Sequence, residues 1–512
     1  MSQKPSEVVD DTVVDEKVDI SLAHAEYASL STEDVAFMLS FTEQERKKVV
    51  RKIDLRVVPV LCSLYLMSFI DRANIGNAKI EGMMEDLNLA GDQYNIAVSI
   101  FFIGYVLLEI PSNVLLKRFT RPSYYLSMLV IAFGICMTLH GVTTNFATLT
   151  VARLFLGITE SGLFPAAMYL VSTWYAPYEV GKRMSVFACT STISGSVSGL
   201  LAYLIAKMKG IAGLNGWQWI FIIEGSITVF FGIITPFILA DSPSLAGRWL
   251  SEREIRYLNT RRYLEFGGSQ AEQEGHKFQW KVLWSVLLDW KIYILILIYW
   301  SNTAPNFATK VNMPTIMTTM GYTSANAQLM TIPPYFVGAC AAFISAWFAD
   351  RYKWRMPFIL VPQLCIMAAF GVLFVYGPNI QDHIPAAYVA IVIACIGFAP
   401  ITPGANAWAS NNIAGPMRRA MGFAFMMGFG NIGGLIGSYI FIEEEKPRYP
   451  TGYGTAMAFG ALGVFCSLGL EFAYWMLNKK KARVSEDAVR ETYTAEQLAA
   501  MGDMSPLYRY TL

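Results

Sequence analysis

The sequence predicts an all-α membrane protein with twelve transmembrane helices arranged in two halves of six. Among its 512 residues, 54% are hydrophobic and only 15% are charged, whereas soluble domains carry about 25% charged residues. Apolar runs of roughly 20 residues, long enough to cross a bilayer core, recur along the chain between short polar breaks. One longer polar segment, 241–290, separates the first six runs from the last six.

The predicted spans and the segments around them divide the chain into five parts. The start of the chain is acidic and lacks an apolar block, which is typical of a disordered tail and not of a cleaved leader. The parts are a disordered acidic cytoplasmic tail (1–50), a first six-helix half (51–240), a cytoplasmic linker (241–290), a second six-helix half (291–477) and a cytoplasmic tail (478–512). The spans are predicted at 55–78, 93–117, 122–141, 146–174, 183–207, 217–240, 291–312, 326–349, 356–377, 385–410, 418–442 and 453–477.

The distribution of lysine and arginine predicts the orientation of the spans. Cytoplasmic loops of membrane proteins carry an excess of these residues, and the basic loops of this chain fall on the side that also holds both termini. The linker on that side contains the charged run SEREIRYLNTRRYLEF, typical of amphipathic helices on a membrane surface. We therefore expect both termini to be cytoplasmic. The predicted outer segments hold only Lys79, Lys207, Lys209, Lys310, Lys446 and Arg448.

The composition excludes several other classes of protein. Lys and Arg number 40 against 39 Asp and Glu, which removes the case for a basic nucleic-acid-binding protein. The 7 cysteines are scattered without a CxxC pair and the 4 histidines lie far apart, so we expect neither a metal site nor a disulfide framework. Because no nucleophile motif or phosphate loop is present, we expect a protein that is not an enzyme and has no cofactor beyond a proton gradient.

Two pairs of charged residues fall deep inside the predicted spans, where each residue is a candidate functional residue because burying a charge in lipid is costly. Asp71 lies roughly 22 Å along the first span, counted from Arg56 at 1.5 Å per residue. Arg72 follows it directly. The alternative is that this helix ends early and leaves both residues solvated at the outer rim.

The second pair, Arg153 and Glu160, is seven residues apart, which is about two helical turns or roughly 10 Å on one face. That spacing is too long for a tight ion pair, so each needs another partner. We expect an arginine of a neighbouring helix to contact Glu160, and a substrate anion or Asp71 to contact Arg153. The alternative is a purely structural buried network. Glu109 and Glu224 are expected near cytoplasmic helix ends, in contact with basic loops.

The second half carries neutral polar and aromatic residues in its spans instead of comparable buried charges. Amides donate and accept neutral hydrogen bonds, and aromatic rings stack on flat ligands. We expect these side chains to bind the body of a substrate, although helix packing explains any single aromatic residue about as well. The candidates are Asn302, Tyr335, Asn406, Trp408 and Asn431.

The loop between the eighth and ninth spans reads AWFADRYKWRMPF and resembles a loop motif of the major facilitator superfamily. Asp350 is expected to cap a neighbouring helix, and Arg351 and Arg355 to pair with acidic helix ends. These three residues would latch one conformation of the protein.

Longer strings carry a closer resemblance over almost the whole chain. LYLMSFIDRANIGNAK, EIPSNVLLKRF, RLFLGITESGLFPAAMYL, GWQWIFIIEG and GDMSPLYRYTL resemble the anion:cation symporter branch of that superfamily, and within it the fungal allantoate and nicotinate permeases. The resemblance implies the major facilitator fold and proton-coupled uptake of organic carboxylates. Arg72 and Arg153 match anion-binding positions of the family, and Asp71 and Glu160 match protonatable ones.

We therefore expect a monomeric plasma-membrane symporter whose partners are a small carboxylate, protons and the lipid bilayer. An exporter that exchanges an organic acid or secondary metabolite for protons is the main alternative. A nutrient receptor that keeps the transporter fold is a further one.

Overall fold

The computed structural model describes residues 32–116, 118–119, 121–175, 177–265, 280–352, 354–484, 489, 492–494, 498 and 502–512. Every regular element within these residues is a helix. Ten helices in this described part are long and apolar enough to cross a membrane, and a shorter apolar helix runs over Met421–Gly437. The long helix α15, which is richer in polar residues, brings the set to twelve.

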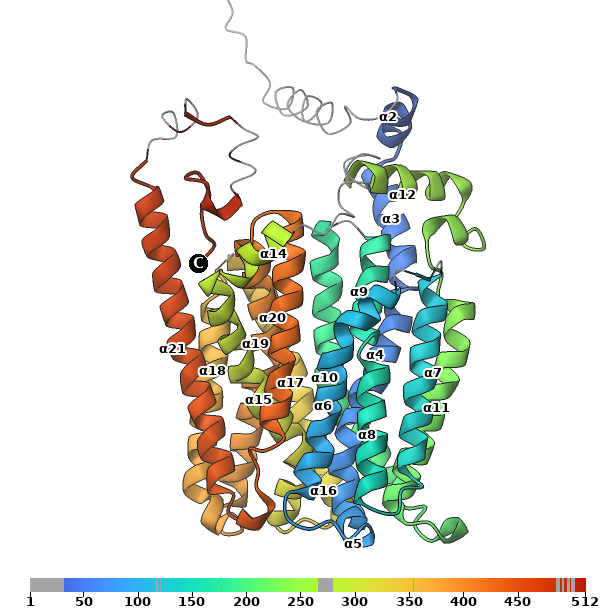
Figure 1. The fold of residues 1–512 in the computed structure, drawn as a ribbon, viewed down its shortest axis with the longest axis vertical. Helices are drawn as coiled ribbons and strands as arrows, with labels where there is room; N and C mark the ends of the chain where they lie inside the picture. Colours follow the sequence, from blue (N-terminus) through green and yellow to red (C-terminus); the bar gives the residue numbers. More distant parts are fainter. Residues whose placement is uncertain are drawn as a thin grey trace, which may run out of the picture.

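The helices form the two predicted halves of six, which lie on the right and the left of Figure 1. The first half holds α4 (Val58–Ala78), α6 (Gln93–Leu116), α7 (Pro122–His140), α8 (Phe146–Glu160) continued by α9 (Leu163–Trp174), α10 (Pro177–Ala206) and α11 (Gly216–Ile238). The second half holds α15 (Trp290–Thr319), α16 (Ser324–Met330) with α17 (Ile332–Tyr352), α18 (Pro357–Tyr376), α19 (Ile384–Asn412), α20 (Pro416–Gly437) and α21 (Pro450–Lys481). The predicted fold of twelve transmembrane helices is confirmed.

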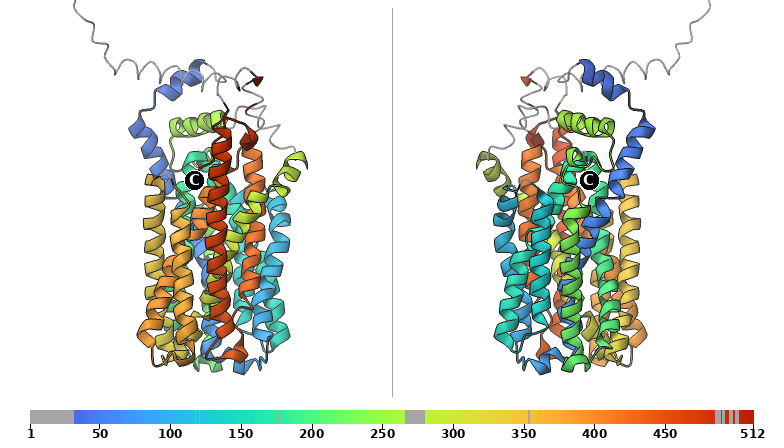
Figure 2. Two further views of the ribbon diagram at one scale, coloured as in Figure 1. Left: turned by 90° about the vertical axis from the view of Figure 1, so that its left-hand side faces the viewer. Right: turned by 90° about the vertical axis from the view of Figure 1, so that its right-hand side faces the viewer.

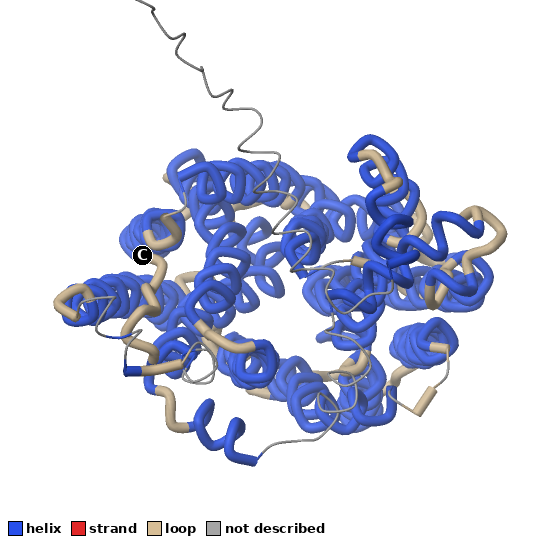
Figure 3. Tube along the Cα trace, turned by 90° about the horizontal axis from the view of Figure 1, so that it is seen from above, coloured by secondary structure: helices blue, strands red, loops and turns tan. Residues whose placement is uncertain are grey.

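Each half is built around its own hydrophobic cluster. The halves meet where α4 packs on α15, α6 on α20 and α10 on α17, and Figure 3 shows their helices arranged around a common centre. The two ends of the bundle differ. One end carries α2 (Thr32–Leu39), α12 (Glu252–Glu265) and the C-terminal residues, and we call it the linker end; the opposite end carries α5 (Met84–Asp86) and α16 (Figures 1 and 2).

Residues 32–50, which we expected to be part of a disordered tail, are largely helical. Thr42 and Glu45 form a reciprocal capping box at the start of α3 (Glu43–Asp54), and this arrangement satisfies two backbone donors. The ring of Phe41 stacks on Tyr257 of α12 at 4.5 Å. The acidic side chains that suggested disorder instead pair with the basic linker, as Arg256 does with Glu33 and Asp34 at 3.0 Å each. Residues 1–31 lie outside the described part of the chain.

The linker contributes two helices, α12 and α14 (Trp280–Leu287), which agrees with the expected number of helices. Residues 266–279 between them are not described. Helix α12 joins the first half through Lys52–Glu254 and Arg261–Glu179 ion pairs. Helix α14 packs on α20 of the second half. The linker therefore attaches one helix to each half.

The C-terminal segment 502–512 packs on the linker end of the second half. Asp503 is 2% exposed and forms ion pairs with Lys291 and Arg418. Tyr510 stacks on Tyr474 at 4.8 Å, and Thr511 hydrogen-bonds through its backbone to Asn412. Burial alone would raise the pKa of the Asp503 carboxyl, but the hydrogen bond and charge of Lys291, the charge of Arg418 and the Tyr510 hydroxyl together hold it below its usual value.

Docking of this segment is expected to depend on the Asp503 charge. A carboxyl whose pKa is lowered in the docked state stabilises docking above the ordinary aspartate pKa of about 4, and this contribution is lost as the pH falls through the lowered value. Asp503→Asn should weaken docking by about 2 kcal/mol at neutral pH. Hydrogen exchange at the Tyr510 amide measures the change. Equal protection in the variant and the parent at pH 7 would contradict the assignment.

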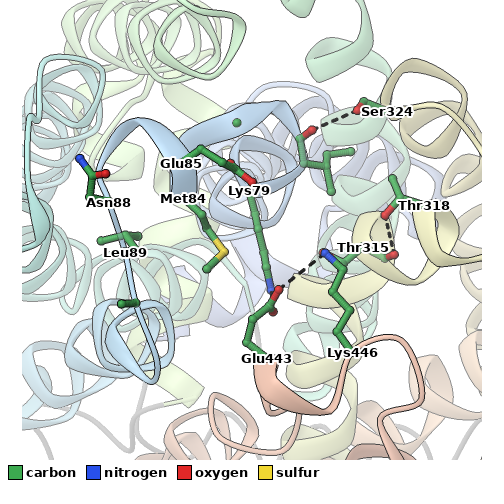
Figure 4. A pocket seen from close by; sticks show the side chains of 13 residues that line it. Lys79, Met84, Glu85, Asn88, Leu89, Thr315, Thr318, Ser324, Glu443 and Lys446 are labelled. Carbon is green, nitrogen blue, oxygen red and sulfur yellow. Dashed lines mark hydrogen bonds and ion pairs between the residues drawn. The ribbon is translucent and has the colours of Figure 1, made fainter.

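Polar contacts between the halves gather toward the opposite end (Figure 4). Lys79, which follows α4, pairs with Glu443 of the second half; Gln328 donates to Glu81 at 3.1 Å, and Ser324 donates to the Ile80 carbonyl at 3.0 Å. The backbone also approaches closely here, because a Cβ on Gly76 would overlap the Val311 carbonyl of α15. The opposite end is therefore closed.

At the linker end, the ion pairs that the structure describes do not join the two halves. They stay within one half or join a half to its own adjacent segment, as with Arg183–Asp54, Lys52–Glu254 and Arg418–Asp289. Lys79–Glu443 thus joins the two halves at the opposite end, whereas the ion pairs named here at the linker end do not cross between the halves.

Breaking the Lys79–Glu443 pair is expected to open the opposite end more often. Lys79 is 7% exposed, and removing one partner leaves the other charge without compensation in the closed state. With Thr315→Cys as a reporter in the adjoining cavity of about 670 Å³, Lys79→Ala should raise the rate of maleimide labelling about tenfold. The swap Lys79→Glu with Glu443→Lys should restore slow labelling. Unchanged labelling in Lys79→Ala would contradict a gating role.

Candidate functional site

Helix α4 places Asp71 and Arg72 deep inside the bundle. The helix continues to Ala78 and passes directly into a π-helical turn, Lys79–Met83, so it does not end early as the alternative supposed. Asp71 is 0% exposed. Both residues therefore lie within the membrane-spanning part of the first half.

Arg72 forms an ion pair with Glu160 of α8. Its Nε and Nη2 atoms each donate to Glu160 Oε1 at 2.7 Å, and Ser68 donates to the same oxygen. The guanidinium lies 4.8 Å from the ring centroids of Phe69 and Tyr105, which gives it cation–π contacts. The structure thus brings Glu160 to an arginine of a neighbouring helix, the arrangement expected from the spacing on α8.

Arg153 and Asp71 lie in the same buried region without a tight contact. Arg153 is 2% exposed, and its Nε and one terminal nitrogen have no hydrogen-bond partner among the described residues. Asp71 has Thr228 of α11 as a polar neighbour, but no described cation lies within ion-pair distance. Two unsatisfied charged groups in the middle of the bundle are costly, which makes this region the candidate functional site.

Glycine allows α8 to approach α6 closely beside these residues. A Cβ on Gly157 would overlap the Phe101 carbonyl, so this glycine brings the two helices into contact and does not open space between Arg153 and Glu160. The close approach fixes α8 against the aromatic residues that surround Arg72.

Glu224 and Glu109 do not lie where the sequence placed them. Helix α11 begins at the opposite end, and Glu224 is 2% exposed within it, where Asn74 of α4 donates to its carboxylate. Glu109 is half-buried in α6 and lies close to Asn431 of α20 and close enough to Arg72 for the two charges to interact. The expectation of contacts with basic cytoplasmic loops was therefore wrong for both, and both belong to the buried charge cluster.

Lys310 also lies elsewhere than expected. The predicted span ended at residue 312 and put Lys310 at an outer end, but α15 runs on to Thr319. Its ammonium reaches into the first half, where it donates to Ser194 Oγ at 2.9 Å and to the Ser191 carbonyl at 3.3 Å. Nζ lies 4.7 Å from the centroid of the Phe69 ring, the same ring that contacts Arg72.

The neutral candidates of the second half divide into three groups. Asn302 donates to Thr402 at 2.8 Å, and its oxygen and that of Asn406 are buried without a partner in the described residues. Asn431 contacts Glu109 across the two halves. Tyr335 is 7% exposed with its ring against Gly195 of α10, so it packs between the halves.

Trp408 is not part of this region, although the sequence suggested that it binds substrate. It is 0% exposed, its Nε1 donates to the Thr511 carbonyl at 3.0 Å, and its ring meets Tyr474 edge-on at 5.8 Å. Trp408 therefore packs against the C-terminal segment, whose docking the span pattern did not reveal.

The proposed latch is described only in part. Arg351 is exposed over the Trp347 ring at 5.8 Å and has no ion pair among the described residues, contrary to the expected pairing with a helix end. The Arg355 backbone amide donates to the Leu512 carbonyl at 2.9 Å. The side chain of Asp350 lies outside the described residues.

Sequence reasoning missed Lys310 and Glu224 as members of the cluster. The signal for Lys310 was the density of polar residues from Ser301 to Asn312, which makes α15 too polar for a lipid-facing helix. No group of three or more metal-ligating side chains occurs in the described part of the chain. The site is thus an arrangement of buried acids and bases suited to binding and proton exchange.

Comparisons of the whole chain with known proteins agree with this arrangement. Residues 61–438 match the Major Facilitator Superfamily. A fungal transporter of that type, cnsO from Penicillium expansum, is 35% identical over 92% of each chain. The high-affinity nicotinic acid transporter of Saccharomyces cerevisiae is 30% identical over 99% of this chain and 94% of its own.

Solved structures show the same fold at low sequence identity. A bacterial homologue of the human lysosomal transporter Spinster, inward-facing and unoccupied, matches with a TM-score of 0.62 and 16% identity over 81% of this chain and 96% of its own. The proton:xylose symporter XylE matches with a TM-score of 0.64 and 15% identity over 82% of this chain and 95% of its own.

Proposed function

The chain belongs to the major facilitator superfamily, and from this premise we propose that it imports a small organic carboxylate together with protons. It is a secondary transporter of the membrane and not an enzyme. The observation that carries the proposal is the buried Arg72–Glu160 ion pair, because a guanidinium can bind a carboxylate substrate and a buried glutamate can carry a proton. Transporters of this kind move their two halves around a site near the middle of the membrane.

The Arg72–Glu160 geometry supplies a mechanism for coupling. While Glu160 is ionised it accepts both Arg72 donors, and a substrate carboxylate would have to compete for them. A proton on Glu160 removes that competition, and the planar guanidinium can then bind the substrate with two parallel hydrogen bonds. Because Glu160 contacts Arg72 in the structure, we propose that Arg72 is the arginine that a proton on Glu160 releases for substrate.

Asp71 and Arg153 complete the proposed route for protons. Asp71 is buried without an ion-pair partner among the described residues, so a proton on it removes the cost of an isolated charge. Arg153 lies in the same buried region as Asp71 and supplies a fixed positive charge there. We propose that protonation of Asp71 and Glu160 accompanies substrate loading, and that their deprotonation accompanies release.

The orientation follows from the basic loops. We propose that the linker end is cytoplasmic, because the loops rich in lysine and arginine lie there. With that orientation, the closed opposite end corresponds to an inward-facing conformation. We further propose that the protein acts as a monomer in the plasma membrane. Supporting this proposal, the Spinster homologue that shares the fold is also inward-facing.

We propose nicotinate as the first substrate to test. One relative is named for nicotinic acid, and the rings of Phe69, Phe101 and Tyr105 around Arg72 offer faces against which a flat aromatic acid can stack. The carboxylate of such a ligand would then accept hydrogen bonds from the edge of the Arg72 guanidinium. Sugars and cations fit this arrangement poorly.

Purified protein in proteoliposomes provides the test. An inward proton gradient should drive accumulation of labelled nicotinate above its external concentration, and the neutral amide nicotinamide should not accumulate. A proton ionophore should abolish the effect. Accumulation driven only by an outward gradient would identify an exporter, and failure of nicotinate, benzoate and allantoate alike would overturn the carboxylate assignment.

A further inference from the structure

We propose that Lys310 is the carboxylate-binding residue of the second half, and that Ser191 and Ser194 hold its ammonium in place until substrate arrives. The proposal rests on the carboxylate transport proposed above and adds a specific contact from the other side of the site. It begins from the position of Lys310, whose backbone lies in α15 while its ammonium touches α10 of the first half.

The partners of Lys310 leave its positive charge uncompensated. Within the described residues, both of its hydrogen bonds go to neutral oxygens, the Ser194 hydroxyl and the Ser191 carbonyl, and no carboxylate pairs with it. Arg72 has Glu160 as its counter-ion. A lysine within a membrane-spanning helix normally has an acidic partner or an anionic ligand. Among the described residues, the Lys310 ammonium therefore lacks an anionic partner, and a substrate carboxylate could supply one.

Lys310 differs in solvent exposure from Arg153, the other cation of the cluster that has no counter-ion in contact among the described residues. Arg153 is 2% exposed and enclosed, whereas Lys310 and the Phe69 ring beside it are both partly exposed. This partial exposure leaves the ammonium more open to a ligand than the guanidinium of Arg153. A ligand at the ammonium can also lay an aromatic ring on Phe69, which already lies between the two cationic groups.

The proposed contact also links binding to movement of the halves. In the present conformation Lys310 ties α15 to α10, because its ammonium donates to two residues of the first half. A substrate carboxylate that accepts from Lys310 replaces these weaker acceptors and releases α10 from α15. Charge-assisted hydrogen bonds to a carboxylate are roughly twice as strong as neutral ones, so the exchange favours the ligand.

Binding to the purified full-length protein tests the proposal independently of transport. Isothermal titration with nicotinate, and with nicotinamide as the neutral control, should show that Lys310→Met weakens nicotinate binding by about tenfold or more. Nicotinamide binding should be unchanged. Lys310→Arg, which keeps the charge, should retain most of the affinity. Unchanged nicotinate affinity in Lys310→Met would overturn the proposal.

Ser194→Ala is expected to change nicotinate affinity in the direction opposite to Lys310→Met. It removes the stronger acceptor that holds the ammonium, so nicotinate should bind more tightly, on the order of threefold. A role for Ser194 in packing alone would leave affinity unchanged or reduce it, and either result would overturn the holding role. This variant also keeps the test decisive if Lys310→Met fails to fold.

The two proposals fail in different ways. If nicotinate binds and depends on Lys310 but does not accumulate under a proton gradient, proton-coupled import is wrong and the Lys310 contact stands. If nicotinate accumulates under the gradient in both the parent and Lys310→Met with equal half-saturation, the Lys310 contact is wrong and the proposed function stands.

Discussion

Replacing Glu160 by glutamine is expected to abolish the accumulation of substrate under a proton gradient while leaving exchange of substrate across the membrane. Glutamine resembles the protonated acid in shape and charge but cannot release a proton. Arg72 then loses its counter-ion at Oε1 and stays available to a carboxylate throughout the cycle. Substrate can still bind and cross, but no proton need travel with it.

Two assays on the same proteoliposomes separate these effects. Uphill uptake of labelled nicotinate under an inward proton gradient should fall to the level of passive equilibration in Glu160→Gln. Exchange of internal labelled for external unlabelled nicotinate, without a gradient, should continue. Glu85→Gln is the matched control, because Glu85 is exposed at the opposite end. If Glu160→Gln still concentrates nicotinate, the coupling group is not Glu160, and Asp71 becomes the candidate.

The fold follows from the sequence because length and hydropathy act locally. A run such as Val58–Ala78 must be a helix in lipid, since every backbone donor needs a partner within its own segment. The same reasoning predicts Asp71 and Arg72 within the first span and places Arg153 and Glu160 on one face of α8. The contact between Glu160 and an arginine of another helix was predicted from spacing alone. Two helical turns separate Glu160 from Arg153, which is too far for a tight ion pair between them.

Errors arose where the outcome depends on contacts between distant segments. Residues 32–50 look disordered because Arg256 of α12, the basic partner of Glu33 and Asp34, lies more than two hundred positions away in the sequence. Trp408 looks like a ligand-binding aromatic residue until the C-terminal segment covers it. Lys310 was placed at an outer end because the predicted span stopped seven residues before α15 ends. The contacts of residues 32–50 and of Trp408 have no local signature in the sequence, whereas the polar residues from Ser301 to Asn312 were a signal for Lys310.

Arg72 is expected to show the second large effect, since it is the cation that Glu160 controls. Arg72→Lys keeps the positive charge but loses the planar fork that now donates twice to Glu160. We expect the half-saturation concentration for nicotinate to rise about tenfold. Arg72→Ala should lose nicotinate transport almost completely, as measured by initial uptake in proteoliposomes under the proton gradient.

A stability measurement separates loss of binding from loss of fold in Arg72→Ala. Removing the guanidinium leaves Glu160, which is 0% exposed, without its counter-ion, and breaking a buried pair in this way costs about 3–5 kcal/mol. The double variant Arg72→Ala with Glu160→Gln removes both charges, so its melting temperature should return toward that of the parent. Nicotinate binding should not return, because the carboxylate anchor is still missing. Recovery of nicotinate binding in the double variant, or transport of a neutral substrate with parental kinetics by Arg72→Ala, would refute the anchor and the carboxylate assignment together.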